Sequence, residues 1–191
     1  EFMTRQTLKE GTDFALKEPN FCDNRELSKA EPIYEVNWGH DTKRYSPQDV
    51  SGLTKDDVKK LKLKWSFAFP NALRARSQPT ISMGAVFVGS QDGRVYAFDL
   101  ETGCTKWVFS ASAEVRTGIV LSTPSEQVSE KNPPLAFFGD LLGRAYAVNA
   151  LNGKLVWSIR TDDHPSTTLT GTPAYYQGVL FIPISSLEVV P

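Results

Sequence analysis

The sequence is short of cysteine, of net charge and of long apolar runs, and each shortage excludes a class of protein. Its two cysteines, Cys22 and Cys104, form neither a CxxC motif nor the CxxCH that attaches haem, and their spacing leaves a disulfide open without favouring it. The formal net charge of −1, from 21 basic and 22 acidic residues, gives no reason to expect nucleic acid as a partner. No apolar run approaches the roughly 18 residues of a transmembrane helix, so we expect no membrane segment.

What the sequence does contain is a repeated phrase. GRVYAFDLETGCTKW at residues 93–107 recurs 50 residues later as GRAYAVNALNGKLVW at residues 143–157. Each copy reads as strand, turn and strand, because apolar and polar positions alternate on both sides of a glycine that can adopt positive φ. Two such copies at this spacing are typical of propellers and related arrays.

Nearly every segment after Pro79 reads as a short strand bounded by turn residues. A first set of four strands covers residues 79–111, and a second covers 117–160 with a proline-containing insertion at 123–134. A third set supplies only a half blade, at 171–188. Strands that follow one another without intervening helices favour antiparallel meanders, and four strands per repeat make a propeller blade. We therefore predict an all-β fold, a partial β-propeller of four-stranded antiparallel blades.

The residues before the blades are less regular. Residues 1–52 are polar and without a clear period, so we interpret them as an N-terminal arm, with the partial propeller at 53–191. The spacing of Thr54 and Asp57 is that of a capping box, which predicts a short helix near 54–62 whose Val58 and Leu61 are buried. Residues 61–69 alternate apolar with polar and predict a strand.

The motif AxDxxTGxxxW is complete at residues 97–107 and resembles the tryptophan-docking motif of quinoprotein dehydrogenase propellers. The second copy keeps the Ala, Gly and Trp but has Asn149 and Asn152 where the family has Asp and Thr. Further phrases, such as RYSPQDVSGLTKDDVKKLKLKWSF, DDHPSTTLTGTP and PISSLE, are most similar to polyvinyl-alcohol dehydrogenases within that family. The resemblance covers about residues 37–188.

This resemblance implies much about function. Members of the family form an eight-bladed propeller with pyrroloquinoline quinone (PQQ) and Ca²⁺ on its axis. They oxidise alcohols, pass electrons to an acceptor and are usually periplasmic, although no signal peptide is visible in this sequence. The strand that corresponds to residues 61–69 completes the family's last blade. Tryptophans that match Trp65, Trp107 and Trp157 pack between blades rather than against the cofactor.

The resemblance also implies three site residues, and each has a plainer alternative. Arg116 matches an arginine that holds the quinone side of the cofactor, although an arginine at a strand entry is often only a solvated charge. Thr170 matches a hydroxyl that bonds a cofactor carboxylate, although beside Gly171 it can bond its own backbone. Glu188 matches the family's Ca²⁺-binding glutamate, although so near the end of this sequence it can also be an unpaired charge. The neighbouring Asp162-Asp163-His164 is more consistent with a polar loop than with a metal site.

Departures from the family pattern limit the expected activity. Arg76 stands where many members have a cofactor-contacting glutamate, and the positions of the catalytic base and the second metal ligand lie further along the chain. We therefore predict no catalytic residue here, and an N-terminal portion of a PQQ- and calcium-dependent alcohol dehydrogenase that is inactive alone. The alternative is a non-catalytic PQQ-repeat scaffold or binding module.

Incomplete blades should also leave strand edges without partners. The strand at 61–69 and the far edge of the strand at 179–185 both lack a neighbour in this chain, and exposed edges recruit other chains. We expect self-association through these edges, by head-to-tail contact or strand exchange. The alternative is an N-terminal arm that folds back and covers an edge.

Overall fold

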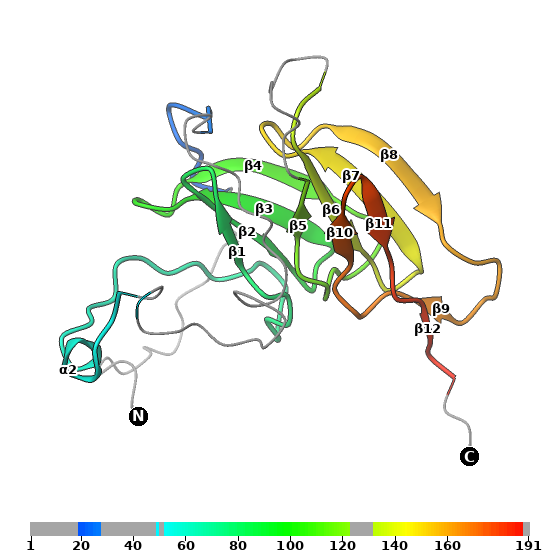
Figure 1. Cartoon of the computed structure of the whole chain (residues 1–191), viewed down its shortest axis with the longest axis horizontal. Helices are drawn as coiled ribbons and strands as arrows, with labels where there is room; N and C mark the ends of the chain where they lie inside the picture. The colour runs from blue at the N-terminus through cyan, green and yellow to red at the C-terminus, as the bar shows by residue number, and fades with distance from the viewer. Residues whose placement is uncertain (1–18, 28–48, 50–51, 123–131, 189–191) are drawn as a thin grey trace.

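The computed structural model describes residues 19–27, 49, 52–122 and 132–188. Two four-stranded antiparallel sheets and two small two-stranded sheets make up this part of the chain, with consecutive strands adjacent in each large sheet (Figure 1). The predicted all-β fold of four-stranded antiparallel blades is confirmed. Among the described residues, no helix is long and apolar enough to cross a membrane.

The two complete blades are built alike. The first contains β1 (Thr80–Ser82), β2 (Ala85–Gly89), β3 (Arg94–Asp99) and β4 (Thr105–Ser110). The second contains β5 (Val120–Leu121), β6 (Leu135–Gly139), β7 (Arg144–Asn149) and β8 (Leu155–Arg160). The third and fourth strands of each blade share the same register, with an irregularity after Ala97 in one blade and after Ala147 in the other. The predicted insertion at 123–134 lies largely outside the described residues.

The third set of strands is smaller than the sequence predicts and is arranged differently. Only β10 (Ala174–Tyr176) and β11 (Val179–Phe181) form the expected hairpin. A second pair, β9 (Thr167–Thr168) and β12 (Ser185–Ser186), was not predicted. It joins the segment before the hairpin to the segment after it.

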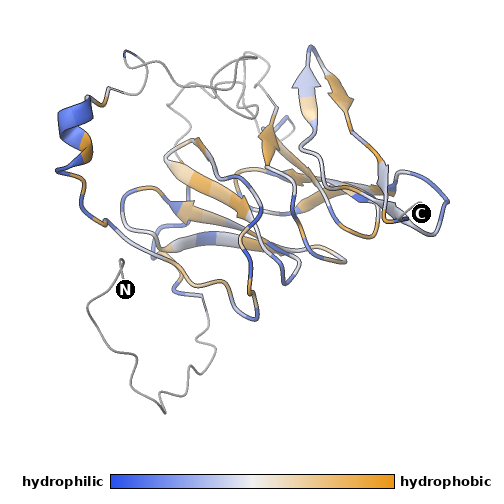
Figure 2. Cartoon of the chain, turned by 90° about the horizontal axis from the view of Figure 1, so that it is seen from below, coloured by the Kyte–Doolittle hydropathy of each residue, from blue (hydrophilic) through white to orange (hydrophobic). Residues whose placement is uncertain are grey.

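Hydrophobic side chains pack between the two blades. Phe87, Trp107, Phe138 and Tyr146 belong to one buried cluster that takes residues from both sheets. Figure 2 shows the hydrophobic residues concentrated along the strands, whereas the short helix is largely hydrophilic. The blades are therefore held together mainly by apolar burial.

The predicted helix is shorter than expected. α2 covers only Lys55–Val58, and the capping box is confirmed by backbone–side-chain hydrogen bonds in both directions between Thr54 and Asp57, of 3.3 and 3.0 Å. The burial of Val58 and Leu61 was predicted wrongly, since they are 58% and 62% exposed. A helix of one turn offers no continuous apolar face for a neighbour to cover.

Residues 61–69 form no strand in the described structure, so that prediction is wrong. The alternation of burial is nevertheless present, because Trp65, Phe67 and Phe69 pack against a cluster that contains Tyr96 and Phe98. No backbone ladder accompanies this packing. Side chains alone hold the segment on the face of the first blade, and its part in closing a ring stays a prediction, as does the division into domains at residue 52.

Tryptophans dock each segment onto the blade that follows it. The indole N–H of Trp107 donates to Ala150 O at 2.9 Å, and that of Trp65 donates to Leu100 O at 3.0 Å. Trp107 is buried as predicted, but the same prediction for Trp157 is wrong, since that side chain is only partly buried. Trp157 meets no corresponding turn of a third blade in the described part of the chain.

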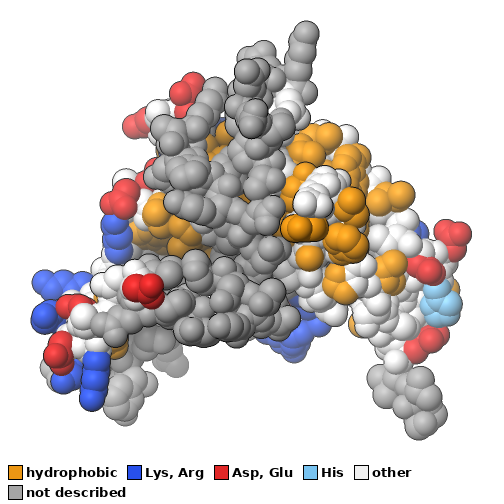
Figure 3. Space-filling view, viewed as in Figure 1, with side chains coloured by type: hydrophobic (Ala, Val, Ile, Leu, Met, Phe, Trp, Pro, Cys, Tyr) orange, Lys and Arg blue, Asp and Glu red, His pale blue; other side chains and the backbone are white. Residues whose placement is uncertain are grey.

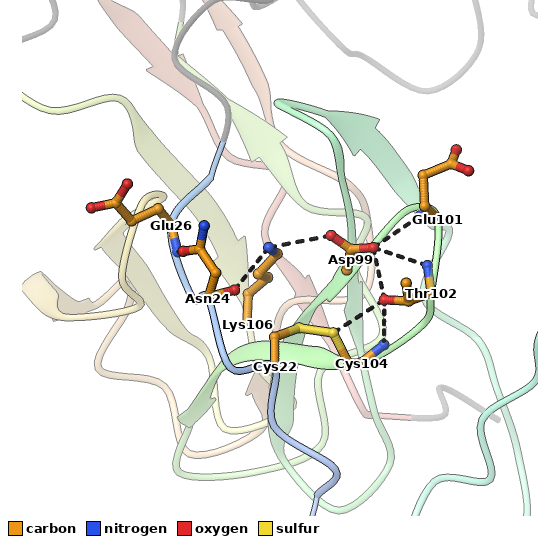
Figure 4. The surroundings of a disulfide bond; sticks show 8 residues. All are labelled: Cys22, Asn24, Glu26, Asp99, Glu101, Thr102, Cys104 and Lys106. Atoms are coloured by element: carbon orange, nitrogen blue, oxygen red, sulfur yellow. Dashed lines mark hydrogen bonds and ion pairs between the residues drawn. A yellow bond between two sulfur atoms is a disulfide. The ribbon is translucent and has the colours of Figure 1, made fainter.

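The disulfide that the sequence did not favour is present. Cys22 and Cys104, 82 residues apart, are bonded to each other (Figure 4). We call residues 19–27 the N-terminal strap, because they run beside the outer strand β4. Cys22 N donates to Thr105 O at 3.0 Å, and Thr105 N donates to Asn20 O at 2.7 Å. The strap thus covers the edge of β4 rather than residues 61–69, and the backbone pairing brings the two cysteines together.

Candidate functional site

Four connections of the two blades lie at one end of the sheets. They are the turns at 90–93 and 140–143 and the loops at 111–119 and 161–173. Strands of an antiparallel meander alternate in direction, so every second connection meets at the same end. We call this end the rim. All three site residues predicted from the sequence lie in these loops or in the segment after β12.

The two rim loops that lead to the inner strands β5 and β10 are anchored in the same way. Val115 N–H donates to Ser90 O at 3.0 Å, beside the turn of the first blade. Leu169 N–H donates to Asp140 O at 3.1 Å, beside the corresponding turn of the second blade. Val115 and Leu169 are therefore structurally equivalent, although the sequence spacing between them is not that of the repeated phrase.

Arg116 and Thr170 directly follow these two anchors. The anchors themselves cover glycines: a Cβ on Gly89 would lie 2.5 Å from the Val115 side chain, and one on Gly139 would lie 2.5 Å from that of Leu169. Only glycine permits such close approach of a loop to the strand. The structure therefore puts Arg116 and Thr170 at matching positions of neighbouring loops, although in the described part of the chain no hydrogen bond joins the two side chains to each other.

A carboxylate holds the guanidinium of Arg116 in place. Arg116 Nε donates to Glu114 Oε1 at 2.9 Å, and Nη2 donates to Oε2 at 3.1 Å. The two side chains are only 24% and 12% exposed. A guanidinium has five N–H donors, so this bidentate pair leaves three for another acceptor. Arg116 is thus an oriented donor at the rim rather than a freely solvated charge.

Thr170 and Glu188 differ from Arg116 in their surroundings. Thr170 is exposed, and no hydrogen bond of its hydroxyl is recorded among the described residues. Glu188 is exposed as well, and its Oε1 lies 3.5 Å from His164 Nε2. His164 in turn donates its backbone N–H to Asp162 Oδ1 at 2.7 Å. The structure therefore brings Glu188 to the Asp162–His164 loop, and in the described residues it joins neither Arg116 nor Thr170.

Sequence reasoning missed two hydroxyls that connect the rim. Ser77 Oγ accepts from Gly89 N at 2.9 Å, and Thr117 Oγ1 accepts from Gly139 N at 3.1 Å. Ser77 Oγ also donates to Thr117 O at 2.8 Å, which joins the two loops directly. The dipeptides Arg76-Ser77 and Arg116-Thr117 share the order of an arginine and a hydroxyl residue, but Arg160-Thr161 has it too, so this pattern alone would not have found the two hydroxyls.

Comparison with known proteins decides the family. The family model PQQ_2, described as outer membrane protein assembly factor BamB, matches residues 38–188, which is most of the chain. The chain belongs to the PQQ_2 repeat family.

Its relatives include dehydrogenases. A polyvinylalcohol dehydrogenase of Pseudomonas sp is 37% identical over 150 residues, covering 78% of this chain and 23% of the relative. A quinoprotein alcohol dehydrogenase PedH of Pseudomonas putida is 29% identical over 148 residues, covering 76% and 24%. The chain thus spans about a quarter of the length of these curated relatives. The resemblance to quinoprotein alcohol dehydrogenases is confirmed.

A solved structure agrees at the level of the fold. The quinohemoprotein alcohol dehydrogenase of Comamonas testosteroni superposes with a TM-score of 0.58 at 24% identity, over 69% of this chain and 20% of that one. This likeness supports the β-propeller architecture of PQQ_2 repeats. At this level of identity it carries no statement about the site.

The rim suits PQQ better than it suits calcium. PQQ is a tricarboxylate, and the rim offers two kinds of donor for carboxylates: the three N–H groups of Arg116 that Glu114 does not take, and the exposed hydroxyl of Thr170. Calcium takes six to eight oxygen ligands, whereas the described residues contain no group of three His, Cys, Asp or Glu side chains that could hold a metal. Glu188 alone does not make such a site.

Proposed function

We propose that this chain is the N-terminal portion of a PQQ-dependent alcohol dehydrogenase of the polyvinyl-alcohol type. One structural observation carries the proposal: Arg116 and Thr170 occupy equivalent positions at one end of neighbouring blades, with unused donors. The similarity to a polyvinylalcohol dehydrogenase adds the substrate class. The alcohol substrate and the electron acceptor belong to the proposal for the complete protein.

The residues of this chain would bind and orient the cofactor. Arg116 would donate its free N–H groups to an oxygen of PQQ while Glu114 keeps the guanidinium in a single orientation. Thr170 would donate its hydroxyl to a carboxylate on the adjacent blade. PQQ, when bound, supplies an ortho-quinone that accepts the electrons of the alcohol.

Calcium and the chemical step depend on more than these residues. Glu188 would contribute one carboxylate to a Ca²⁺ site, with the remaining oxygens supplied by other parts of the complete protein. To do so it must leave His164, its partner at 3.5 Å. No residue of this chain is assigned as the catalytic base, so we propose that the chain alone does not oxidise alcohol.

An activity assay of two proteins tests this proposal. One protein is the 191-residue chain, and the other carries the reading frame on to the full length of the relatives. With PQQ and Ca²⁺, we expect alcohol-dependent dye reduction by the longer protein only, and its loss in Arg116→Gln. Lys154→Gln changes an exposed cation in the β7–β8 turn, at the opposite end of the second blade, and serves as the matched control. A longer protein that binds no PQQ would contradict the proposal.

A non-catalytic scaffold is the second candidate. It is favoured by the description of the matching family model, an outer membrane protein assembly factor, and by Arg76 at the position of a cofactor-contacting glutamate. A scaffold would bind peptide or protein and ignore PQQ. Binding of PQQ to the rim discriminates between the two.

The disulfide supports a periplasmic location. Bonds such as Cys22–Cys104 persist in oxidising compartments and are rare in the cytosol. We propose that the protein acts in the periplasm. Export can be measured by expressing the native reading frame with a reporter that is active only outside the cytoplasm. Retention of the reporter in the cytoplasm would contradict this location.

We also propose that the chain associates with itself. Apolar side chains are exposed on the last strands, among them Tyr176, Val179 and Phe181 at 58%, 52% and 57%. Figure 3 shows hydrophobic side chains gathered over the region of β10 and β11. The outer edge of β11 has no strand partner among the described residues. Light scattering should give a mass that rises with concentration, and a monomer at high micromolar concentration would contradict this.

A further inference from the structure

A second arginine, Arg76, occupies the position on the rim that Arg116 and Thr170 occupy in the next two loops. Ser77 and Thr117 are structurally equivalent, because each accepts the backbone N–H of the glycine that ends the second strand of its blade. Arg76 directly precedes Ser77, just as Arg116 directly precedes Thr117. Arg76 therefore occupies the same position in the first blade as Arg116 occupies in the second.

The two arginines also belong to segments that touch. Ser77 Oγ donates to Thr117 O at 2.8 Å, and Thr80 Oγ1 donates to Ile119 O at 2.6 Å. These two bonds hold the segment that contains Arg76 alongside the segment that contains Arg116. Arg76 thus belongs to a segment that runs beside the segment of Arg116 at the rim, and Thr170 holds the equivalent position on the next loop.

The charge of Arg116 is neutralised by a neighbouring carboxylate, whereas that of Arg76 is not. Glu114 forms a bidentate pair with Arg116, so that pair is neutral as a unit. Arg76 is exposed, and no acidic side chain pairs with it among the described residues. Arg76 therefore adds uncompensated positive charge to this part of the rim, as does the exposed Arg74, whose backbone N–H donates to Gln91 of the rim turn at 3.1 Å. An anion that approaches Arg116 gains most if Arg76 takes one of its other carboxylates.

We infer that Arg76 is a second carboxylate-binding residue of the rim, which together with Arg116 selects a ligand with more than one carboxylate. This inference rests on the proposed function, since PQQ is such a ligand. It assigns to Arg76 the opposite charge preference from the glutamate of many family members. The guanidinium of Arg76 would hold a cofactor carboxylate through paired N–H donors. A glutamate at this position would instead have to share a proton with that carboxylate.

Titration of PQQ into the 191-residue chain tests this inference without any activity measurement. Binding would be followed by calorimetry in the unaltered chain and in Arg76→Gln, Arg76→Glu and Arg116→Gln. Lys154→Gln is the matched control, because Lys154 is also an exposed cation but lies in the β7–β8 turn at the opposite end of the second blade. Circular dichroism and thermal unfolding would show that each variant is folded.

We expect Arg76→Gln to weaken PQQ binding about tenfold, the effect of losing one charge-assisted hydrogen bond, and Arg76→Glu to weaken it further. Lys154→Gln should stay within about twofold of the unaltered chain, and the salt dependence should decrease in the Arg76 variants and in Arg116→Gln but not in this control. Unchanged binding in Arg76→Gln with weakened binding in Arg116→Gln would overturn this inference and leave the proposed function standing. Absence of PQQ binding to the unaltered chain would overturn this inference, and absence of binding to the longer protein as well would overturn the proposed function.

Discussion

The indole of Trp107 lies over the backbone of Gly153, in the blade that follows its own. A Cβ at Gly153 would be 2.7 Å from Cε3 of that ring, and the glycine has a φ of +71°. Trp65 packs on Gly103 in the same way, because a Cβ at Gly103 would be 2.5 Å from Cδ2 of the Trp65 ring. One contact thus recurs between successive segments of the chain, and it explains why the repeated phrase requires both its glycine and its tryptophan.

Removing the Trp107 ring should cost more stability than any other tryptophan change in the described structure. Trp107 is 5% exposed and also bonds Ala150 O, so Trp107→Ala should lower the free energy of unfolding by about 3–5 kcal/mol. Trp157→Ala is the control and should cost less than half as much, because that ring is only partly buried. Chemical denaturation measures both. A cost below about 1 kcal/mol for Trp107→Ala would show that docking is not what holds the blades.

Reduction of the disulfide should destabilise the first blade. The Cys22–Cys104 bond closes a long loop and fixes the strap on β4, so its loss should cost about 2–4 kcal/mol. Thermal unfolding with and without a reducing agent measures this. The double variant Cys22→Ser, Cys104→Ser should be insensitive to the reducing agent. Two free thiols in the oxidised protein, found by mass spectrometry after alkylation, would contradict the prediction.

Asp99 should make stability depend on pH below about 4. Burial raises the pKa of Asp99, but hydrogen bonds from the Thr102 side chain and N–H, together with Lys106 at 3.2 Å, outweigh it and leave the pKa below its usual value (Figure 4). A lowered folded-state pKa means that Asp99 stabilises the fold above the unfolded-state pKa, and that this contribution disappears as the pH falls through the folded-state value.

The variant Asp99→Asn makes this measurable. It should be less stable than the unaltered chain at pH 7, and the difference should shrink as the pH falls below about 4. Denaturation curves at several pH values give both quantities. The second blade already carries Asn149 at this position, so Asn149→Ala is a comparison whose effect should not change with pH. A constant difference between Asp99→Asn and the unaltered chain would contradict the assignment.

The fold could be predicted because its signals are local. Alternation, glycine turns and the repeated phrase depend on residues a few positions apart, and they placed both complete blades correctly. The contacts that the sequence did not reveal join distant segments. Cys22 reaches Cys104 only because the strap pairs with β4, and Trp157 stays partly exposed because no third turn covers it here. Residues 61–69 have the period of a strand but lack a backbone partner.

The candidate site was predictable by residue type but not by environment. The sequence indicated Arg116, Thr170 and Glu188, and neither the Glu114 clamp nor the His164 contact follows from spacing alone. Glu114 pairs with Arg116 because the loop turns back within two residues. His164 meets Glu188 because the chain returns to the same place more than twenty residues later. The equivalence of Arg76 and Arg116 appears only when the hydroxyls of Ser77 and Thr117 are seen to accept equivalent glycine N–H groups.

Those hydroxyls give a further prediction. Thr117→Val keeps the shape of the side chain but leaves the buried Gly139 N–H without its acceptor, so it should cost about 1–3 kcal/mol. Thr161→Val serves as the control, with an expected cost below about 1 kcal/mol, because the Gly143 O that its hydroxyl bonds still accepts the Thr161 backbone N–H at 2.9 Å. Equal costs in equilibrium unfolding would contradict the role given to Thr117.

The central claim is that the rim around Arg116 and Thr170 binds PQQ. A crystal structure of the chain, or of its longer reading frame, grown with PQQ tests it most directly. The account predicts cofactor density at this end of the blades, with one oxygen within hydrogen-bond distance of Arg116 and a carboxylate within reach of the Thr170 hydroxyl. Crystals grown at saturating PQQ that show this rim empty, or the quinone at the opposite end beside Gly103 and Gly153, would contradict it.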